Sequence, residues 1–170
     1  MVGTAHKRHL PGAISFALAQ IPFYGWRDTV QMAKGMTAMA DKLSADSNAA
    51  FLAENAKKEG VTTTASGLQY RVITAGSGKK PGPRQTVTVH YAGSLIDGTE
   101  FDSSYRRGQT ISFRLDQVIP GWTEGLQLMQ EGETAELVIP EHIGYGARGA
   151  GASIPPYQTL IFKVELRAVS

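Results

Sequence analysis

The chain has 170 residues and a mass of 18.3 kDa, enough for one domain with an extension. Hydrophobic residues make up 42% and charged residues 19%, which is typical of soluble globular proteins and excludes wholesale disorder. The absence of cysteine excludes disulfides, cysteine nucleophiles and thiolate zinc sites, and a net charge of +2 argues against a nucleic-acid groove. Because no run of about 18 apolar residues occurs, no membrane insertion is expected.

Residues 1–28 are expected to form a leader. A basic cluster at residues 6–9 precedes a mostly apolar stretch, and Ala17-Leu18-Ala19 has the small-x-small form of a signal-peptidase site. Pro11 and Gly12 interrupt the apolar stretch, however, so two interpretations stay open. The leader is either a weak signal peptide or a disordered N-terminus.

Residues 29–60 are predicted to form a helical segment. One apolar stripe on a 3.6-residue helix is formed by Met32, Met36, Met39 and Leu43. The pattern breaks near residue 44, and Asp46 or Ser47 could cap a second stretch that ends near Gly60. The stripe either packs on its own domain or makes the segment a connector or dimerisation arm, since methionine adapts to irregular interfaces.

Residues 61–170 have the sequence pattern of a second, mostly β, domain, in which β-branched and aromatic residues alternate with polar ones and glycines interrupt the strands. Strands are expected around residues 68–72, 87–91, 111–115, 136–139 and 160–166, with a short helix between Gly121 and Gly132. Asp97-Gly98 predicts a hairpin with a type I′ turn. Several short strands and one helix predict an antiparallel α+β domain in which the helix covers one sheet face, with room for a pocket between them.

A conventional active site is missing from the sequence. No nucleophile elbow and no metal-ligand spacing occur, so neither a catalytic triad nor a metal is expected. His90 alternates with Val89 and Tyr91 and should face away from them.

The glycine-rich segment at residues 144–149 matches G-x-G-x-x-G, a dinucleotide-binding pattern. The fingerprint must open a helix, but Pro155 and Pro156 soon follow, so this reading is rejected in favour of a loop over a pocket. Trp122 at a helix start and Tyr145 in that loop are candidates for the floor and the rim of the pocket.

Four stretches together resemble the FKBP-type peptidyl-prolyl cis-trans isomerases. They are VHYAGSLIDGTEFDSS at residues 89–104, QVIPGWTEGLQLM at 117–129, GYGARGAGASIPP at 144–156 and TLIFKVEL at 159–166. The resemblance covers residues 61–170. The lead-in FLAENAKKEGV and the stretch SGLQYRVITAGSG further resemble the bacterial macrophage-infectivity-potentiator-like branch, whereas residues 1–28 do not resemble its dimerisation segment.

The resemblance implies a bent antiparallel sheet wrapped around a short helix, with the site between them. Carried over by motif, the catalytic residues would be Tyr91, Phe101, Asp102, Trp122 and Tyr145. The substrate-binding residues would be Arg107, Val118, Ile119, Ile154 and Phe162. Ile111 and Ala150 depart from the aromatic residue and the histidine that some members carry there.

The resemblance also implies the function. We expect an isomerase that accelerates rotation about X–Pro bonds in unfolded or proline-containing proteins during folding, without a metal or cofactor, in the bacterial cytoplasm or periplasm. Macrolides of the rapamycin type would be inhibitors, and the N-terminal helix could form a homodimer. The alternative is a non-catalytic chaperone or peptide-binding module that uses the same pocket.

Overall fold

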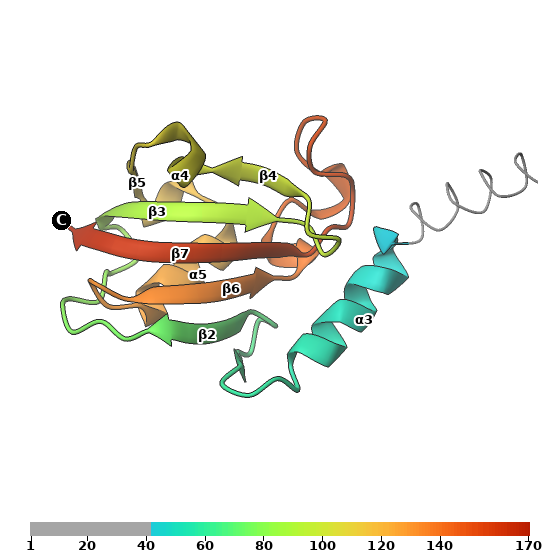
Figure 1. The fold of residues 1–170 in the computed structure, drawn as a ribbon, viewed down its shortest axis with the longest axis horizontal. Helices are drawn as coiled ribbons and strands as arrows, with labels where there is room; N and C mark the ends of the chain where they lie inside the picture. Colours follow the sequence, from blue (N-terminus) through green and yellow to red (C-terminus); the bar gives the residue numbers. More distant parts are fainter. Residues whose placement is uncertain (1–41) are drawn as a thin grey trace, which may run out of the picture. The chain divides into compact units, whose positions relative to one another are not determined.

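The computed structural model describes residues 42–170, in which an antiparallel sheet wraps around a helix (Figure 1). The strands are β1 (Thr62–Thr63), β2 (Gln69–Thr74), β3 (Thr86–Ser94), β4 (Glu100–Ser103), β5 (Ile111–Arg114), β6 (Thr134–Ile139) and β7 (Leu160–Val169). The α-helices are α3 (Ala45–Asn55), α4 (Ser104–Arg107) and α5 (Pro120–Leu128). Short 3₁₀ turns lie at Leu115–Gln117, Glu141–Ile143 and Gly146–Arg148. The predicted α+β class is therefore confirmed.

The sheet order is β1-β2-β6-β7-β3-β4, with β5 also paired to β3. β7 lies in the middle, since it pairs with β3 along one edge and β6 along the other. Alternate residues of these strands point to the inner face, where they form the core with α5. Among its fully buried members are Val89, Leu137 and Val164.

Helix α5 packs against the inner face of the sheet. Pro120 starts it, as suits a residue without a backbone donor in a first helical turn. Trp122 and Leu126, which share one face, are buried, as their spacing predicts. A Cβ added at Gly125 would lie 2.7 Å from the Leu137 side chain, so glycine is what allows the helix to approach β6 this closely.

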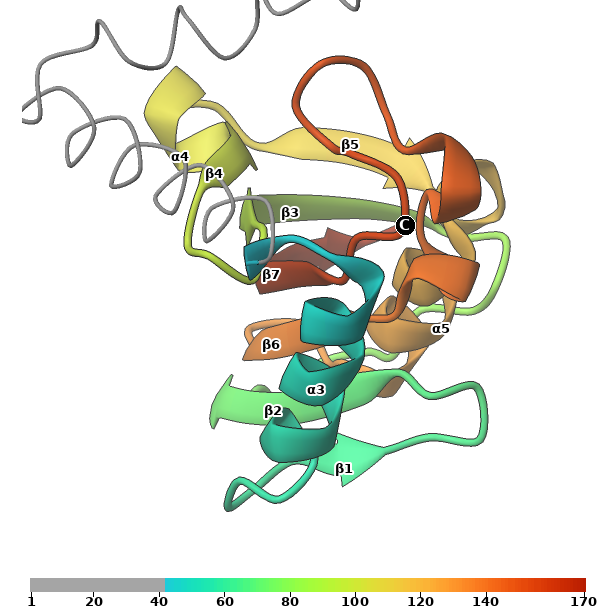
Figure 2. The same ribbon diagram turned by 90° about the vertical axis from the view of Figure 1, so that its right-hand side faces the viewer.

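Helix α3 lies across one end of the sheet (Figure 2) and belongs to the compact unit formed by Ala40–Ser170. Its N-cap is Ser44, whose side chain accepts a hydrogen bond from the Ser47 amide at 3.1 Å, so the expected cap at Asp46 or Ser47 was wrong. The helix ends at Asn55 and does not reach Gly60. Its buried positions are polar, Asn48 and Asn55, which an apolar pattern could not predict.

Of the predicted methionine stripe, only Leu43 lies in the described residues, and it packs against the core of this unit. Met32, Met36 and Met39 lie outside them, as does the whole predicted leader. None of the helices in residues 42–170 has the length and apolarity that crossing a bilayer requires.

The hairpin that joins β3 to β4 is present, but its turn is not of type I′. Gly98 has a φ of 87°, whereas Asp97 is not among the residues with positive φ. The Gly98 amide donates to the Leu95 carbonyl, and the Asp97 carboxylate accepts from the Thr99 amide. That side-chain bond stabilises an ordinary turn followed by a left-handed glycine, one of the longer hairpin connections.

Candidate active site

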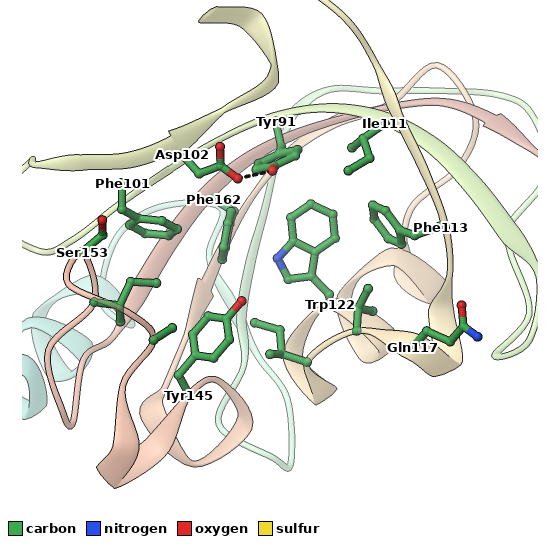
Figure 3. A pocket seen from close by; sticks show the side chains of 14 residues that line it. Tyr91, Phe101, Asp102, Ile111, Phe113, Gln117, Trp122, Tyr145, Ser153 and Phe162 are labelled. Carbon is green, nitrogen blue, oxygen red and sulfur yellow. Dashed lines mark hydrogen bonds between the residues drawn. The ribbon is translucent and has the colours of Figure 1, made fainter. Parts of the chain in front are cut away.

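A cleft of about 670 Å³ opens between the inner face of the sheet and α5 (Figure 3). Its walls come from five separate parts of the chain: β3 and β4, β5 with the turn after it, α5, the segment between β6 and β7, and β7 itself. It is lined by Tyr91, Phe101, Asp102, Ile111, Phe113, Gln117, Val118, Ile119, Trp122, Tyr145, Ala150, Ser153, Ile154 and Phe162. The lining is mostly apolar and aromatic, as is usual for small-ligand sites.

Trp122 forms the floor of the cleft. Its ring lies edge-on to three other rings, those of Tyr91, Phe113 and Phe162, with centroid distances of 5.2, 5.1 and 5.0 Å. Edge-to-face contacts of this kind are favourable for aromatic rings and fix their orientation. Only 6% of Trp122 is exposed, so the indole is held rigidly from beneath while it lines the cleft.

The left wall in Figure 3 depends on a glycine in β3. Phe101 from β4 meets Phe162 from β7 edge-on at 5.5 Å, and both rings lie over Gly93. A Cβ at Gly93 would lie 2.6 Å from the Phe101 ring and 2.7 Å from the Phe162 ring. Any larger residue would push both rings into the cleft.

The cleft has one polar corner. The Tyr91 hydroxyl and the Arg107 guanidinium each donate a hydrogen bond to the Asp102 carboxylate, and Arg107 also donates to the Tyr91 oxygen at 3.2 Å. Burial raises the pKa of Asp102, but these two hydrogen bonds, the positive charge of Arg107 and the Ser103 amide together hold the pKa below its ordinary value. Burial and the bond to the carboxylate raise the pKa of Tyr91. At neutral pH the corner therefore holds a fixed carboxylate and a neutral tyrosine.

The rim segment, residues 144–157, forms one side of the cleft. Tyr145 is 40% exposed and extends into the mouth of the cleft in Figure 3, whereas Ile154 is buried. Ala150 and Ile154 exchange two backbone hydrogen bonds, of 2.9 and 3.1 Å, which close the tip of the segment. No helix follows the glycines at residues 144–149 within this segment, as predicted, which excludes a phosphate-binding helix N-terminus there.

Nine of the ten candidate residues line this one cleft; the tenth, Arg107, lies behind Asp102 as its partner. Sequence reasoning did not assign Phe113, Gln117 or Ser153 to the site. Phe113 alternates with Ile111 along β5, a signal that could have placed it on the same wall. Gln117 and Ser153 lie in a 3₁₀ turn and a loop, where no periodicity indicates which way a side chain points.

His90 lies outside the cleft, on the face of β3 opposite Tyr91, as predicted. Its ring stacks on Tyr105 at 4.6 Å, and its Nδ1 lies 2.8 Å from the Ser104 hydroxyl. Within residues 42–170, no three of His, Cys, Asp and Glu lie together in a way that could hold a metal ion.

The arrangement suits a change of conformation better than the breaking of a bond. Among residues 42–170, those that line the cleft include no histidine, lysine or cysteine. Asp102 is held in its ionised form by hydrogen bonds from Tyr91 and Arg107. Apolar walls of this kind strip water from a ligand, and the polar corner orients it.

Two family models match the chain. One, described as FKBP-type peptidyl-prolyl cis-trans isomerase, matches residues 77–167. The other, described as the domain amino terminal to FKBP-type peptidyl-prolyl isomerase, matches residues 14–72. This second match begins well before Phe51 and includes residues 14–28, where no resemblance to the N-terminal segment of the branch was expected, so that expectation was wrong for these residues.

Curated relatives from bacteria carry corresponding names. The chain is 59% identical over 116 residues to the FKBP-type 22 kDa peptidyl-prolyl cis-trans isomerase of Escherichia coli K12, a match that covers 68% of the chain and 56% of that protein. It is 52% identical over 120 residues to the outer membrane protein MIP of Legionella longbeachae, covering 71% of the chain and 52% of that protein. The chain thus spans about half the length of these relatives.

Solved structures agree with the fold. A peptidyl-prolyl cis-trans isomerase from Pseudomonas syringae superposes with a TM-score of 0.70 at 44% identity, covering 74% of the chain and 92% of that structure. FkpA from Escherichia coli superposes with a TM-score of 0.71 at 41% identity, covering 94% of the chain and 79% of that structure. Since a single family model accounts for more than half of its residues and close relatives share both fold and sequence, the chain belongs to the FKBP-type peptidyl-prolyl cis-trans isomerase family.

Proposed function

We propose that the chain catalyses cis–trans isomerisation of X–Pro peptide bonds in unfolded or partly folded proteins. The observation that carries the proposal is the aromatic cleft with Trp122 as its floor and one ionised, immobilised carboxylate at its edge. Its apolar lining is suited to a proline ring, and among the described residues the lining includes no histidine or lysine that could activate the Ser153 hydroxyl as a nucleophile, which isomerisation does not need.

Desolvation provides the catalytic principle. Rotation about a peptide bond has a barrier of roughly 18–20 kcal/mol because the planar amide is stabilised by resonance. Water bound to the substrate carbonyl favours the planar, charge-separated form. An apolar cleft removes that water and therefore binds the twisted transition state better than the planar ground state.

The required stabilisation is modest. Uncatalysed isomerisation takes about 10–100 s, whereas ordinary turnover numbers are about 1–1,000 per second. The ratio is about 10–10⁵, so the cleft must supply only roughly 1.4–7 kcal/mol. Shape, exclusion of water and one or two hydrogen bonds are sufficient for that amount.

We assign the roles by position. Trp122 supports the proline ring, while the Ile119 backbone amide at the start of α5 and the Tyr145 hydroxyl on the rim would bind substrate carbonyls. Asp102 faces the reacting amide as a fixed negative charge, because both of its oxygens accept hydrogen bonds from Tyr91 and Arg107. It orients the amide dipole and does not transfer a proton.

A non-catalytic chaperone using the same cleft is the second candidate. A refolding assay in which a proline isomerisation limits the rate distinguishes the two. An isomerase accelerates the slow phase at concentrations far below that of the substrate, whereas a holding chaperone slows refolding or needs stoichiometric amounts. Failure to accelerate at one part in a hundred, with a folded protein, would favour the chaperone.

We also propose that the segment before α3 provides a second binding surface, for another copy of the chain or for clients, through the methionine stripe. Holding a client near the cleft raises its local concentration. Because α3 is packed in the same unit as the sheet, the informative truncation removes residues 1–41 only. Activity on short peptides should survive, activity on unfolded proteins should fall, and sedimentation reports any loss of dimer. Equal activity on both substrates before and after truncation would contradict the proposal.

A further inference from the structure

Helix α3 contacts the base of the rim segment that carries Tyr145 and Ile154 to the cleft. A groove of about 520 Å³ runs between α3 and the two ends of the β6–β7 connection. Ala45, Ala49 and Leu52 line it on the helix side, and Pro140 and Tyr157 line it on the other.

Two buried amides join α3 to the C-terminal base of the rim segment. Asn48, 3% exposed, accepts a hydrogen bond from the Thr159 amide at 2.7 Å through its Oδ1, and its Nδ2 lies 3.4 Å from the Gln158 Oε1. Gln158, 2% exposed, donates through its Nε2 to the carbonyls of Leu43 at 2.8 Å and Pro156 at 2.9 Å. Buried polar groups are costly unless paired, so these bonds specify a single arrangement.

The residue between these bonds has an unfavourable backbone conformation. Tyr157 has a φ of 61°, and among residues 42–170 it is the one non-glycine residue with positive φ. A side chain with a Cβ rarely adopts this conformation unless its surroundings impose it. The Tyr157 amide donates to the Gly146 carbonyl at 3.0 Å, so the same residue ties the C-terminal arm of the rim to the arm that begins with Tyr145.

These contacts form a connected path from α3 to the mouth of the cleft. We propose that Asn48 and Gln158 are positioning residues, which hold the rim segment in the conformation that presents Tyr145 and Ile154 to the substrate. The inference rests on the proposed isomerase function, because the rim matters only if the cleft is the site of the reaction. Helix α3 would then influence the catalytic efficiency of the domain in addition to connecting the domain to the preceding residues of the chain.

The chain contains a matched control on the same helix. Asn55 is also buried, and its Nδ2 donates to Gln69 Oε1 at 2.6 Å. Gln69 in turn donates to the Leu52 carbonyl at 2.8 Å. This pair ties α3 to β2 and has no bond to the rim segment. Asn55→Ala therefore removes a comparable buried amide without touching the proposed path.

The experiment compares full-length Asn48→Ala, Gln158→Met and Asn55→Ala with the wild type, well below their melting temperatures. Gln158→Met keeps the volume of the side chain but cannot donate, so it provides the test even if Asn48→Ala does not fold. The first readout is hydrogen exchange at the amides of Ala150, Ile154 and Tyr157, each bonded within the rim segment. The second is kcat/KM on a short proline peptide.

We expect Asn48→Ala and Gln158→Met to speed exchange of the three rim amides about fivefold or more, and to lower kcat/KM about three- to tenfold through misplaced contacts. Asn55→Ala should lower the melting temperature while leaving both readouts near wild type. Equal effects of all three variants, or no effect of the first two, would overturn the inference. A wild-type protein without isomerase activity would instead refute the proposed function, and the exchange measurements would still decide whether α3 holds the rim.

Discussion

Replacing Trp122 by alanine separates the role of the cleft from that of the core. The indole is buried and makes edge-on contacts with three other rings. Removing a large aromatic side chain costs about 3–5 kcal/mol of folding stability, to be compared with about 5–15 kcal/mol for a whole domain. Trp122→Ala should therefore remain folded at low temperature, where activity can be measured.

The same change should reduce catalysis strongly. Without the indole, water reaches the floor of the cleft and part of the roughly 1.4–7 kcal/mol of transition-state stabilisation is lost. We expect kcat/KM to fall about tenfold to hundredfold, equivalent to about 1.4–3 kcal/mol. The assay is cis–trans isomerisation of a short proline peptide, with circular dichroism to show that the variant is folded.

Leu126→Ala is the matched control. Leu126 lies one helical turn further along α5, is fully buried and does not line the cleft. Its removal costs about 2–5 kcal/mol, comparable to the loss at Trp122, but kcat/KM should stay within about twofold of wild type when the protein is folded. A folded Trp122→Ala variant with wild-type kcat/KM, or an equal loss in Leu126→Ala, would refute the assignment of the cleft floor.

Three further predictions concern pH and ligands. The pH–rate profile should be flat between about pH 6 and 8, because the lowered pKa of Asp102 and the raised pKa of Tyr91 keep both groups in one charge state there; a bell-shaped profile would indicate proton transfer instead. Burial raises the pKa of Glu133 above its unfolded value, so wild type should lose stability relative to Glu133→Gln as the pH rises from about 4.5 toward neutrality, measured by urea denaturation; a constant difference would contradict this. A rapamycin-type macrolide should inhibit competitively in the peptide assay, with affinity changed by Ile111→Phe or Ala150→His on the cleft wall, and full activity in saturating macrolide would count against the proposed site.

The architecture follows from the sequence because its signals are local and strong. Alternation along β3 and the helical spacing of Trp122 and Leu126 indicate which faces become the core. Burial of one sheet face then fixes the pairing register of the strands, since a shift by one residue would expose a whole row of apolar side chains.

Other features depend on contacts between distant residues, and sequence patterns do not report those. The buried side of α3 carries Asn48 and Asn55. Asn48 pairs with Thr159, 111 residues further along the chain, and Asn55 pairs with Gln69, 14 residues further along. A search for apolar patterns misses an interface made by such polar residues. Polar positions such as Gln117 and Ser153 enter the cleft through turns rather than through strand alternation. The prediction for the Asp97-Gly98 turn was wrong for a local reason, because the Asp97 carboxylate accepts a hydrogen bond from the Thr99 amide and stabilises another turn conformation.

The central place of β7 has a consequence for how the protein is made. β7 follows every other described strand along the chain, yet it joins β3 to β6 and carries Phe162 into the cleft. Until its 10 residues emerge from the ribosome, which takes about 0.5–2 s at ordinary rates of synthesis, the growing chain holds two half-sheets with open edges. Completion then relies on pairings between distant segments, the slow class of folding reaction, in roughly milliseconds to seconds. A nascent chain without β7 therefore lacks the strand that brings Phe162 to the cleft, and the proposed folding catalyst has to complete its own fold before it can act on another protein.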